Sequence, residues 1–179
     1  MRIIAGQWRG RPIEAPPGTA TRPTSDRARE GLFSMLTSRL GSFEGLQVAD
    51  LFAGTGALGL EALSRGAAYC TFVENDRAAL DALKRNVERL GAGDRAEIRA
   101  QAAEHVSLAP CDLVLVDPPY GAGLAQAALD RAAGWLALGG WLSIELHGEA
   151  LNAPAGLAIE AERRYGKANV VLLRAAARP

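Results

Sequence analysis

The sequence predicts an α/β protein with a doubly wound, mostly parallel sheet. From residue 46 onward, short apolar segments alternate with helical segments, an order typical of parallel strands covered by helices on both faces. Val48 to Phe52 and Val114 to Val116 are largely apolar, as central parallel strands must be. The last two strand-like segments are separated by only a short turn, which predicts an antiparallel hairpin at the carboxyl end.

A separate extension is predicted before this alternating part. Apolar segments flank Gly6-Gln7-Trp8-Arg9-Gly10 and indicate a small hairpin. Apolar residues then recur at helical spacing over residues 26–40. We therefore expect a hairpin-and-helix extension over residues 1–45, followed by an α/β domain over residues 46–179.

Within the α/β domain the expected elements follow one another without an internal repeat. Strands are expected at Gln47–Phe52, Tyr69–Glu74, Ala96–Ala100, Leu113–Asp117, Trp141–Leu146, Leu157–Arg164 and Asn169–Arg174. Helices are expected at residues 57–65, 77–90, 102–108 and 124–138. Because the turn at residues 165–167 leaves no room for a helix, one of the last two strands should be antiparallel.

The composition is that of an ordinary globular protein. The chain has 179 residues, of which 49% are hydrophobic and 22% charged. No apolar segment approaches the roughly 20 residues of a membrane span, and the first residues lack the apolar core of a signal peptide. Cys70 and Cys111 are isolated, so we interpret them as buried thiols in a reducing compartment, by default the cytoplasm.

Positive charge is concentrated at the start of the chain. The net charge is zero, yet residues 1–30 hold six arginines against three acids, a net of +3 that leaves the remainder at −3. A basic arm on a slightly acidic body favours docking to a polyanion. A solvated surface without a partner explains the same charges equally well.

A glycine-rich turn is predicted between the first strand of the α/β domain and its helix. Gly54-Thr55-Gly56-Ala57-Leu58-Gly59 follows a strand and precedes a helix, and Glu74 lies twenty residues after Gly54. That spacing is the outline of a dinucleotide-binding site, in which an acid holds the ribose hydroxyls. An NAD(P)-binding oxidoreductase is therefore one candidate.

Asp50 favours a different ligand. It precedes Gly54 by four residues and should point toward the ligand, where its carboxylate would repel a pyrophosphate. S-adenosylmethionine carries a sulfonium, an ammonium and a ribose but no phosphate, so Asp50 could face the ammonium while Glu74 takes the ribose. The alternative for Asp50 is a cap beneath the sheet, and for Glu74 a surface acid. The residues expected to bind this cofactor are Asp50, Phe52, Ala53, Gly54, Thr55, Gly56, Glu74, Asn75, Gln101, Ala102 and Asp117.

The second motif, Asp117-Pro118-Pro119-Tyr120, ends the apolar segment that begins at Leu113. The Asp117 carboxylate and the Pro118 carbonyl could accept the two N–H bonds of a planar amino group, and proline fixes that carbonyl. Tyr120 could stack on a base, a contact worth about 1–3 kcal/mol. These four residues are the predicted catalytic site; no metal is expected, and His105 and His147 are interpreted as structural or surface residues.

Such a clamp admits only an unstacked or flipped base. The basic extension could then hold RNA phosphates. The predicted RNA-binding residues are Arg2, Trp8, Arg9, Arg11, Arg22 and Arg27, with Trp8 as a stacking ring or, alternatively, as packing under the hairpin. Trp135 and Trp141 are expected in the core.

Residues 2–10, residues 22–30, Asp50 to Gly59, Glu74 and Asp117 to Tyr120 closely resemble the bacterial 16S ribosomal RNA (guanine-N2) methyltransferase D family. The resemblance covers nearly the whole chain. It implies a seven-stranded, Rossmann-like class I methyltransferase that uses S-adenosylmethionine to methylate one guanine of 16S rRNA in the small subunit or its assembly intermediate. We expect a monomer.

Other functions fit the same motifs. An amino-group clamp could serve adenine N6 or a protein glutamine instead of guanine. A silent RNA-binding module would need no intact Asp117, and an oxidoreductase would bind NAD(P).

Overall fold

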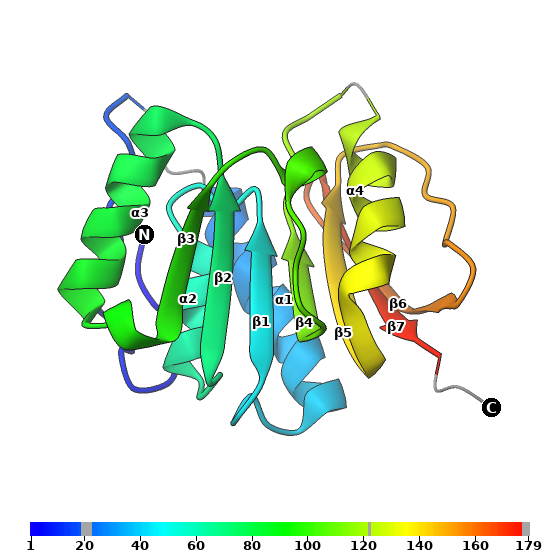
Figure 1. Cartoon of the computed structure of the whole chain (residues 1–179), viewed down its shortest axis with the longest axis horizontal. Helices are drawn as coiled ribbons and strands as arrows, with labels where there is room; N and C mark the ends of the chain where they lie inside the picture. The colour runs from blue at the N-terminus through cyan, green and yellow to red at the C-terminus, as the bar shows by residue number, and fades with distance from the viewer. Residues whose placement is uncertain (19–22, 122, 177–179) are drawn as a thin grey trace.

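A computed structural model describes residues 1–18, 23–121 and 123–176, without the side chains of residues 23–25. One seven-stranded sheet runs through the molecule in the order β3-β2-β1-β4-β5-β7-β6 (Figure 1). Its strands are β1 Gln47–Leu51, β2 Tyr69–Glu74, β3 Ala96–Ala100, β4 Cys111–Val116, β5 Leu136–Leu146, β6 Leu157–Tyr165 and β7 Ala168–Ala175. The first five pair in parallel, and β7 runs antiparallel to both β5 and β6. The predicted doubly wound sheet with its carboxyl-terminal hairpin is confirmed.

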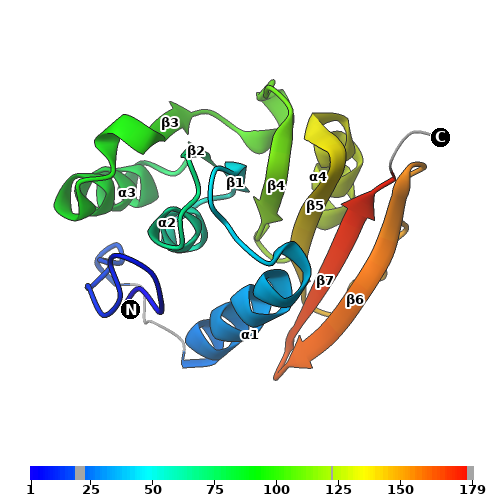
Figure 2. The same cartoon turned by 90° about the horizontal axis from the view of Figure 1, so that it is seen from below.

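Helices cover both faces of the sheet (Figure 2). They are α1 Pro23–Leu40, α2 Ala57–Ser64, α3 Arg77–Leu90 and α4 Leu124–Ala132, with short 3-10 turns at Gly93–Arg95, Ala103–His105 and Ala133–Trp135. The first three helices share one apolar core with Val48, Phe72 and Leu113. On the opposite face α4 packs on Leu51, Val116 and Ile144. Successive strand residues point to opposite faces, so the strands shared by the two cores are apolar on both sides.

Three predicted elements differ in the structure. The amino-terminal hairpin is reduced to one isolated antiparallel bridge between Arg2 and Pro12. Three backbone bonds still join its two arms, but the amides of Ile4 and Ala5 bond to Glu61 of α2 instead of extending the pairing. The helix expected at residues 102–108 is only a 3-10 turn, since the short link from β3 to β4 ends at Pro110, which cannot continue a helix. The helix expected to reach residue 138 ends at Ala132, and Leu136 already pairs with Cys111 as part of β5.

Other expectations about the core are confirmed. Cys70 and Cys111 are buried free thiols, and Trp135 and Trp141 are buried. In the described part of the chain, no helix combines the length and the apolar character that crossing a membrane requires. The extension is joined to the body, since Ile3, Ile13 and Phe33 are buried in the same core as the residues of α2 and α3.

Candidate active site

A cavity of about 210 Å³ lies between the glycine turn that follows β1, helix α1 and the end of β4. The strand order reverses between β1 and β4, and open α/β sheets bind ligands at such a switch point. Of the predicted site residues, the structure brings Asp50, Phe52, Ala53, Gly54, Thr55 and Asp117 together as lining of this cavity. Two charged residues that were not predicted, Arg29 and Glu145, line it as well.

The three glycines of the turn have different roles. Gly54 and Gly56 adopt positive φ values of 57° and 83°, and a Cβ placed on Gly54 would meet no atom within 4 Å. A ligand can therefore approach the backbone closely at Gly54. At Gly59 a Cβ would lie 2.4 Å from the Phe72 ring and 2.6 Å from Cys70 Sγ, so Gly59 allows α2 to pack directly on β2.

Asp50 bonds to the backbone of α2 with one carboxyl oxygen and leaves the other oxygen unpaired. It is only 1% exposed, and its Oδ2 accepts a hydrogen bond from the Gly59 amide at 2.9 Å. Its Oδ1 has no hydrogen-bond partner, although the residue lines the cavity. Burial, more than any neighbouring charge, raises the pKa of Asp50 well above its usual value. A cationic ligand group beside Oδ1 would supply the missing partner and stabilise the ionised form, which is the fit expected for the ammonium of S-adenosylmethionine.

Glu74 holds the glycine turn in place. Its Oε2 accepts from the Gly54 amide at 2.7 Å, and its Oε1 accepts from the amides of Asn75 and Asp76 at 2.8 and 2.9 Å. An ionised carboxylate has about four acceptor sites, so about one remains for a ribose hydroxyl. Asn75 bonds to Glu74 through its backbone amide. Neither Glu74 nor Asn75 is among the described residues that line the cavity.

The predicted adenine-side residues lie apart from the cavity. Gln101 and Ala102 follow β3 and are half-buried, but they are not among its described lining residues. A second, narrow pocket lies on the other side of Phe52, and its lining includes Ala103 and Glu104. Phe52 borders both pockets with a left-handed φ of 59°, a backbone strain of the kind that collects at binding sites. Phe52 is therefore the residue that separates the cavity from this second pocket.

The Asp-Pro-Pro-Tyr corner begins where β4 ends at Val116. Asp117 lies at the cavity, and Tyr120 is 58% exposed beside it in sequence. The Tyr120 ring meets the His147 ring edge-on, with centroids 4.1 Å apart. The corner thus pairs a carboxylate inside the cavity with an aromatic ring that solvent and a substrate can reach.

A second carboxylate, Glu145 at the end of β5, lies close to Asp117. Asp117 is solvent-accessible on its open side, but the surrounding protein removes water from its carboxyl and, with the nearby charge of Glu145, raises the pKa of Asp117 to about 7. His147, whose Nε2 lies 2.9 Å from Glu145 Oε1, opposes this rise in the pKa of Asp117. Burial also raises the pKa of Glu145.

Sequence reasoning missed Glu145 and His147 as site residues. Glu145 is the last residue but one of β5, and His147 follows that strand as Asp117 follows β4. Parallel neighbours bring their carboxyl ends to one edge, which was the available signal. Ligand atoms of Asp117, Glu145 and His147 lie within 4.8 Å of one another, a set that could hold a metal ion. Such acidic groups are common without one, so the absence of a metal requirement stays a prediction.

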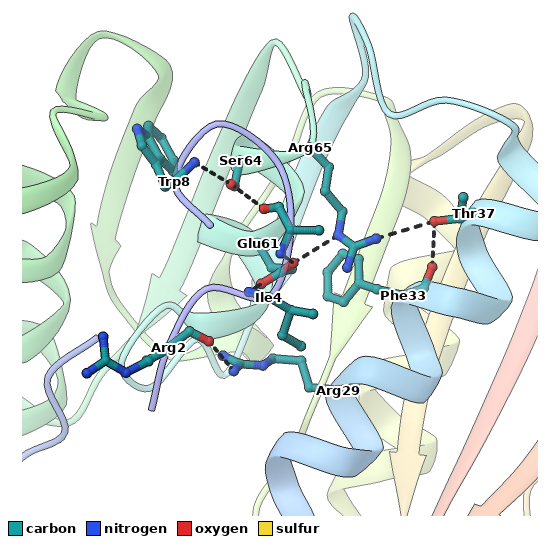
Figure 3. A network of polar contacts seen from close by, with 10 residues as sticks. Arg2, Ile4, Trp8, Arg29, Phe33, Thr37, Glu61, Ser64 and Arg65 are labelled. Carbon is teal, nitrogen blue, oxygen red and sulfur yellow. Dashed lines mark hydrogen bonds and ion pairs between the residues drawn. The ribbon is translucent and has the colours of Figure 1, made fainter. Parts of the chain in front are cut away.

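The extension is fixed to α2 by a buried polar network (Figure 3). Glu61, which is fully buried, accepts from the amides of Ile4 and Ala5 at 2.9 and 3.0 Å and pairs with Arg65 at 2.9 Å. Ser64 Oγ donates to the Ala5 carbonyl and accepts from the Trp8 amide. This network places the first residues of the chain beside the cavity, where Met1 is part of the lining.

The prediction that Trp8 stacks on RNA is wrong. The side chain is 8% exposed, and the Arg95 guanidinium covers its ring at 5.1 Å. Packing under the extension, the alternative left open by the sequence, is what the structure shows.

Among the predicted RNA-binding arginines, Arg2, Arg9, Arg11 and Arg27 are exposed. Arg2 donates to the Gly10 carbonyl at 2.7 Å, and Arg11 donates to the Arg89 carbonyl. Arg22 lies outside the described residues. The exposed arginines are thus available on the surface of the extension.

Comparison with known proteins identifies the family of the chain. A sequence profile of the family described as Conserved hypothetical protein 95 matches residues 1–174. The Ribosomal RNA small subunit methyltransferase D of Escherichia coli K12 is 43% identical over 141 residues, which are 76% of this chain and 70% of that protein. The chain therefore belongs to the family of this profile, which is the methyltransferase D family. The resemblance inferred from the motifs is therefore confirmed.

Solved structures extend the likeness to the whole fold. The structure of yhhF from Escherichia coli has 38% identity and a TM-score of 0.87, with 99% of each chain covered. A magnesium protoporphyrin IX methyltransferase from Synechocystis PCC 6803, solved with bound SAM, has a TM-score of 0.71 at 14% identity over 89% of this chain and 87% of that one. The second likeness shows the class I methyltransferase fold alone.

Proposed function

We propose that this member of the methyltransferase D family transfers a methyl group from S-adenosylmethionine to the N2 amino group of one guanine in small-subunit ribosomal RNA. Family membership identifies the chain as an rRNA methyltransferase with this donor. The observation that carries the guanine proposal is the position of Asp117, which lines the same cavity as the Gly54 turn and begins the Pro-Pro-Tyr corner, where Pro119 and Tyr120 are exposed.

The cavity suits the donor by charge. Asp50, Asp117 and Glu145 all line it, so carboxylates face a ligand that carries a sulfonium and an ammonium. When bound, S-adenosylmethionine supplies a methyl group activated by its positively charged sulfur. The Gly54 turn leaves open space for the close approach of a ligand.

The acceptor is a weak nucleophile, because the lone pair of an exocyclic amino group is delocalised into the base. Asp117 Oδ and the Pro118 carbonyl are proposed to accept its two N–H bonds and hold the nitrogen in line with the methyl group. As the N–C bond would form and the bond between the methyl group and sulfur would break, leaving neutral S-adenosylhomocysteine, positive charge would grow on nitrogen beside the Asp117 carboxylate, which would then take one proton. A carboxyl with a pKa of about 7 is well matched to accept that proton near neutral pH.

Glu145 and His147 are proposed to act on this clamp from β5. The Glu145 charge contributes to the raised pKa of Asp117, and His147 links Glu145 to Tyr120, because it bonds to the first and packs its ring on the second. His147 would thereby orient the ring that stacks on the flipped base.

The RNA would reach the site across the extension. Arg9 and Arg27 are exposed, whereas Arg2 and Arg11 would have to share the carbonyl bonds that they make in the protein. We propose these four, with Arg22, as phosphate contacts that set the position of the base without reading its identity. The proposed setting is a monomer acting in the cytoplasm on the small subunit or an assembly intermediate.

A methyl-transfer assay tests the proposal. Small subunits that lack the modification are incubated with labelled donor, and the methylated nucleotide is mapped. We expect one N2-methylguanine in 16S rRNA, and loss of turnover in Asp117→Ala with donor binding largely retained. Label on adenine N6 or on a protein glutamine would show that guanine N2 is not the substrate. Near-normal turnover in Asp117→Ala would show that Asp117 has no part in the mechanism.

A further inference from the structure

Arg29 is an unusual residue in this cavity because it is both buried and incompletely bonded. It lies on α1, is 5% exposed, and lines the cavity opposite the glycine turn. Its Nη2 donates to the Arg2 carbonyl at 2.6 Å and lies 3.3 Å from Asp26 Oδ1. Its Nε and Nη1 have no hydrogen-bond partner. Figure 3 shows the guanidinium reaching from α1 to the backbone of the extension.

Leaving charged N–H groups buried without acceptors is costly. Burial lowers the pKa of Arg29, while the negative charges of Glu61 and Asp26 raise it again. No described carboxylate of the cavity bonds to Nε or Nη1. A guanidinium in this state has the chemistry to bind an oxyanion.

The charges of the cavity indicate which oxyanion it is. Arg29 is the one cationic side chain among its described lining residues, against the three acids Asp50, Asp117 and Glu145. The methionyl end of the donor carries an ammonium and a carboxylate on the same carbon. The carboxylate would be repelled by the acids unless a cation received it. Asp50 Oδ1 is an unpaired acceptor and Arg29 provides unpaired donors in the same cavity, so together they complement both charges.

We infer that Arg29 binds the methionyl carboxylate of S-adenosylmethionine while Asp50 faces its ammonium. This inference rests on the proposed function, because it assigns one end of the donor within that same cavity. The assignment also gives a purpose to the contact between Arg29 and the Arg2 carbonyl, since that bond holds the guanidinium in place before the ligand arrives. Burial of Arg29 disfavours the other oxyanion at hand, an RNA phosphate, which stays at the protein surface.

Calorimetric titration with two ligands tests the assignment without any turnover. S-adenosylmethionine carries the carboxylate, and decarboxylated S-adenosylmethionine is the same cation without it. We expect Arg29→Gln to weaken binding of the first about 10- to 100-fold, the loss typical of one hydrogen bond to a charged group. Binding of the decarboxylated ligand should differ less than about threefold between wild type and variant. Arg29→Lys, which keeps the charge, should recover part of the loss.

Other results of the titrations would overturn the assignment of Arg29 to the carboxylate. Equal weakening of both ligands in Arg29→Gln would mean that the residue only shapes the cavity, and the inference would fall. Unchanged binding of both ligands with weaker binding of small subunits would assign Arg29 to RNA phosphate instead. If Arg29→Gln does not fold, the wild type and Arg29→Lys still decide, since a wild type that binds both ligands equally needs no carboxylate partner. Failure of the wild type to bind either ligand would overturn the proposed function itself.

Discussion

Glu61 is the residue whose removal should most directly separate the extension from the rest of the protein. Glu61→Ala deprives the amides of Ile4 and Ala5 of their acceptor and leaves Arg65 without its partner. Breaking a buried ion pair by removing one member costs about 3–5 kcal/mol. The Arg65 side chain is 15% exposed, so water can partly replace Glu61 and the lower end, about 3 kcal/mol, is expected. At about 2–4 °C per kcal/mol for a chain of this size, Tm should fall by about 6–12 °C.

Differential scanning calorimetry of matched variants measures this loss. Glu88→Ala, on the exposed side of α3, serves as the control and should change stability by less than about 0.5 kcal/mol. Glu61→Gln keeps one acceptor oxygen and should fall between the two. Limited proteolysis of Glu61→Ala should cut first within residues 1–18. A Tm for Glu61→Ala equal to that of Glu88→Ala would refute the idea that this carboxylate holds the extension.

Three further outcomes are expected. Asp117 must be ionised to accept a proton, and its pKa in the free protein is raised to about 7. The value of kcat/KM for the donor, which reports the free protein, should therefore fall as pH drops through about 7. Glu145→Gln removes a charge that raises this pKa, so the fall should move to lower pH, and an unmoved profile would exclude Glu145 from the site. Gly59→Ala places a methyl group 2.4 Å from the Phe72 ring, so urea unfolding should show a loss of about 1–3 kcal/mol, whereas Gly93→Ala, with no neighbour within 4 Å, should show little. Arg9→Glu combined with Arg27→Glu should reduce the salt dependence of RNA binding by about one to two units of slope, and the same change at exposed Arg163 and Arg164 should not.

The parts of the fold that the sequence predicted well are those in which local pattern and burial agree. β2, α3 and β3 lie at the predicted residues, and the carboxyl-terminal hairpin was predicted because its turn is too short for a crossover. Predictions failed where pairing overrode the pattern. Leu136 to Leu138 continue the helical spacing of α4, yet β5 already begins there because Leu136 pairs with Cys111.

The site shows the same limit. Asp117 and the Gly54 turn carry local signals and were found, whereas Glu145, His147 and Arg29 become site residues only through the strand order and the packing of α1. Trp8 was predicted to bind RNA because its neighbours in sequence are basic, as in an exposed segment. Its burial depends on Arg95 and Ser64, which are more than fifty residues away in sequence.

Binding of the donor should release protons from the carboxyls of the cavity, and this release can be measured. The pKa of Asp50 is raised mainly by burial and that of Asp117 by burial and by Glu145, so both bind protons more tightly than exposed acids do. A cationic ligand beside them lowers these pKa values again, and the protons must leave as it binds. At pH 7, close to the pKa of Asp117, up to about half a proton should come from that residue.

Calorimetry in buffers of different ionisation enthalpy counts these protons. S-adenosylhomocysteine keeps the ammonium but has a neutral sulfur, so it should release fewer protons than S-adenosylmethionine. Asp117→Asn should reduce the difference between the two ligands, because the sulfonium then faces no titrating carboxyl there. The part of the release that comes from Asp117 should decline above pH 7, where that carboxyl is already ionised in the free protein. Equal proton counts for both ligands in the wild type would show that the positively charged sulfur does not lie near Asp117, and the geometry proposed for methyl transfer would fail with it.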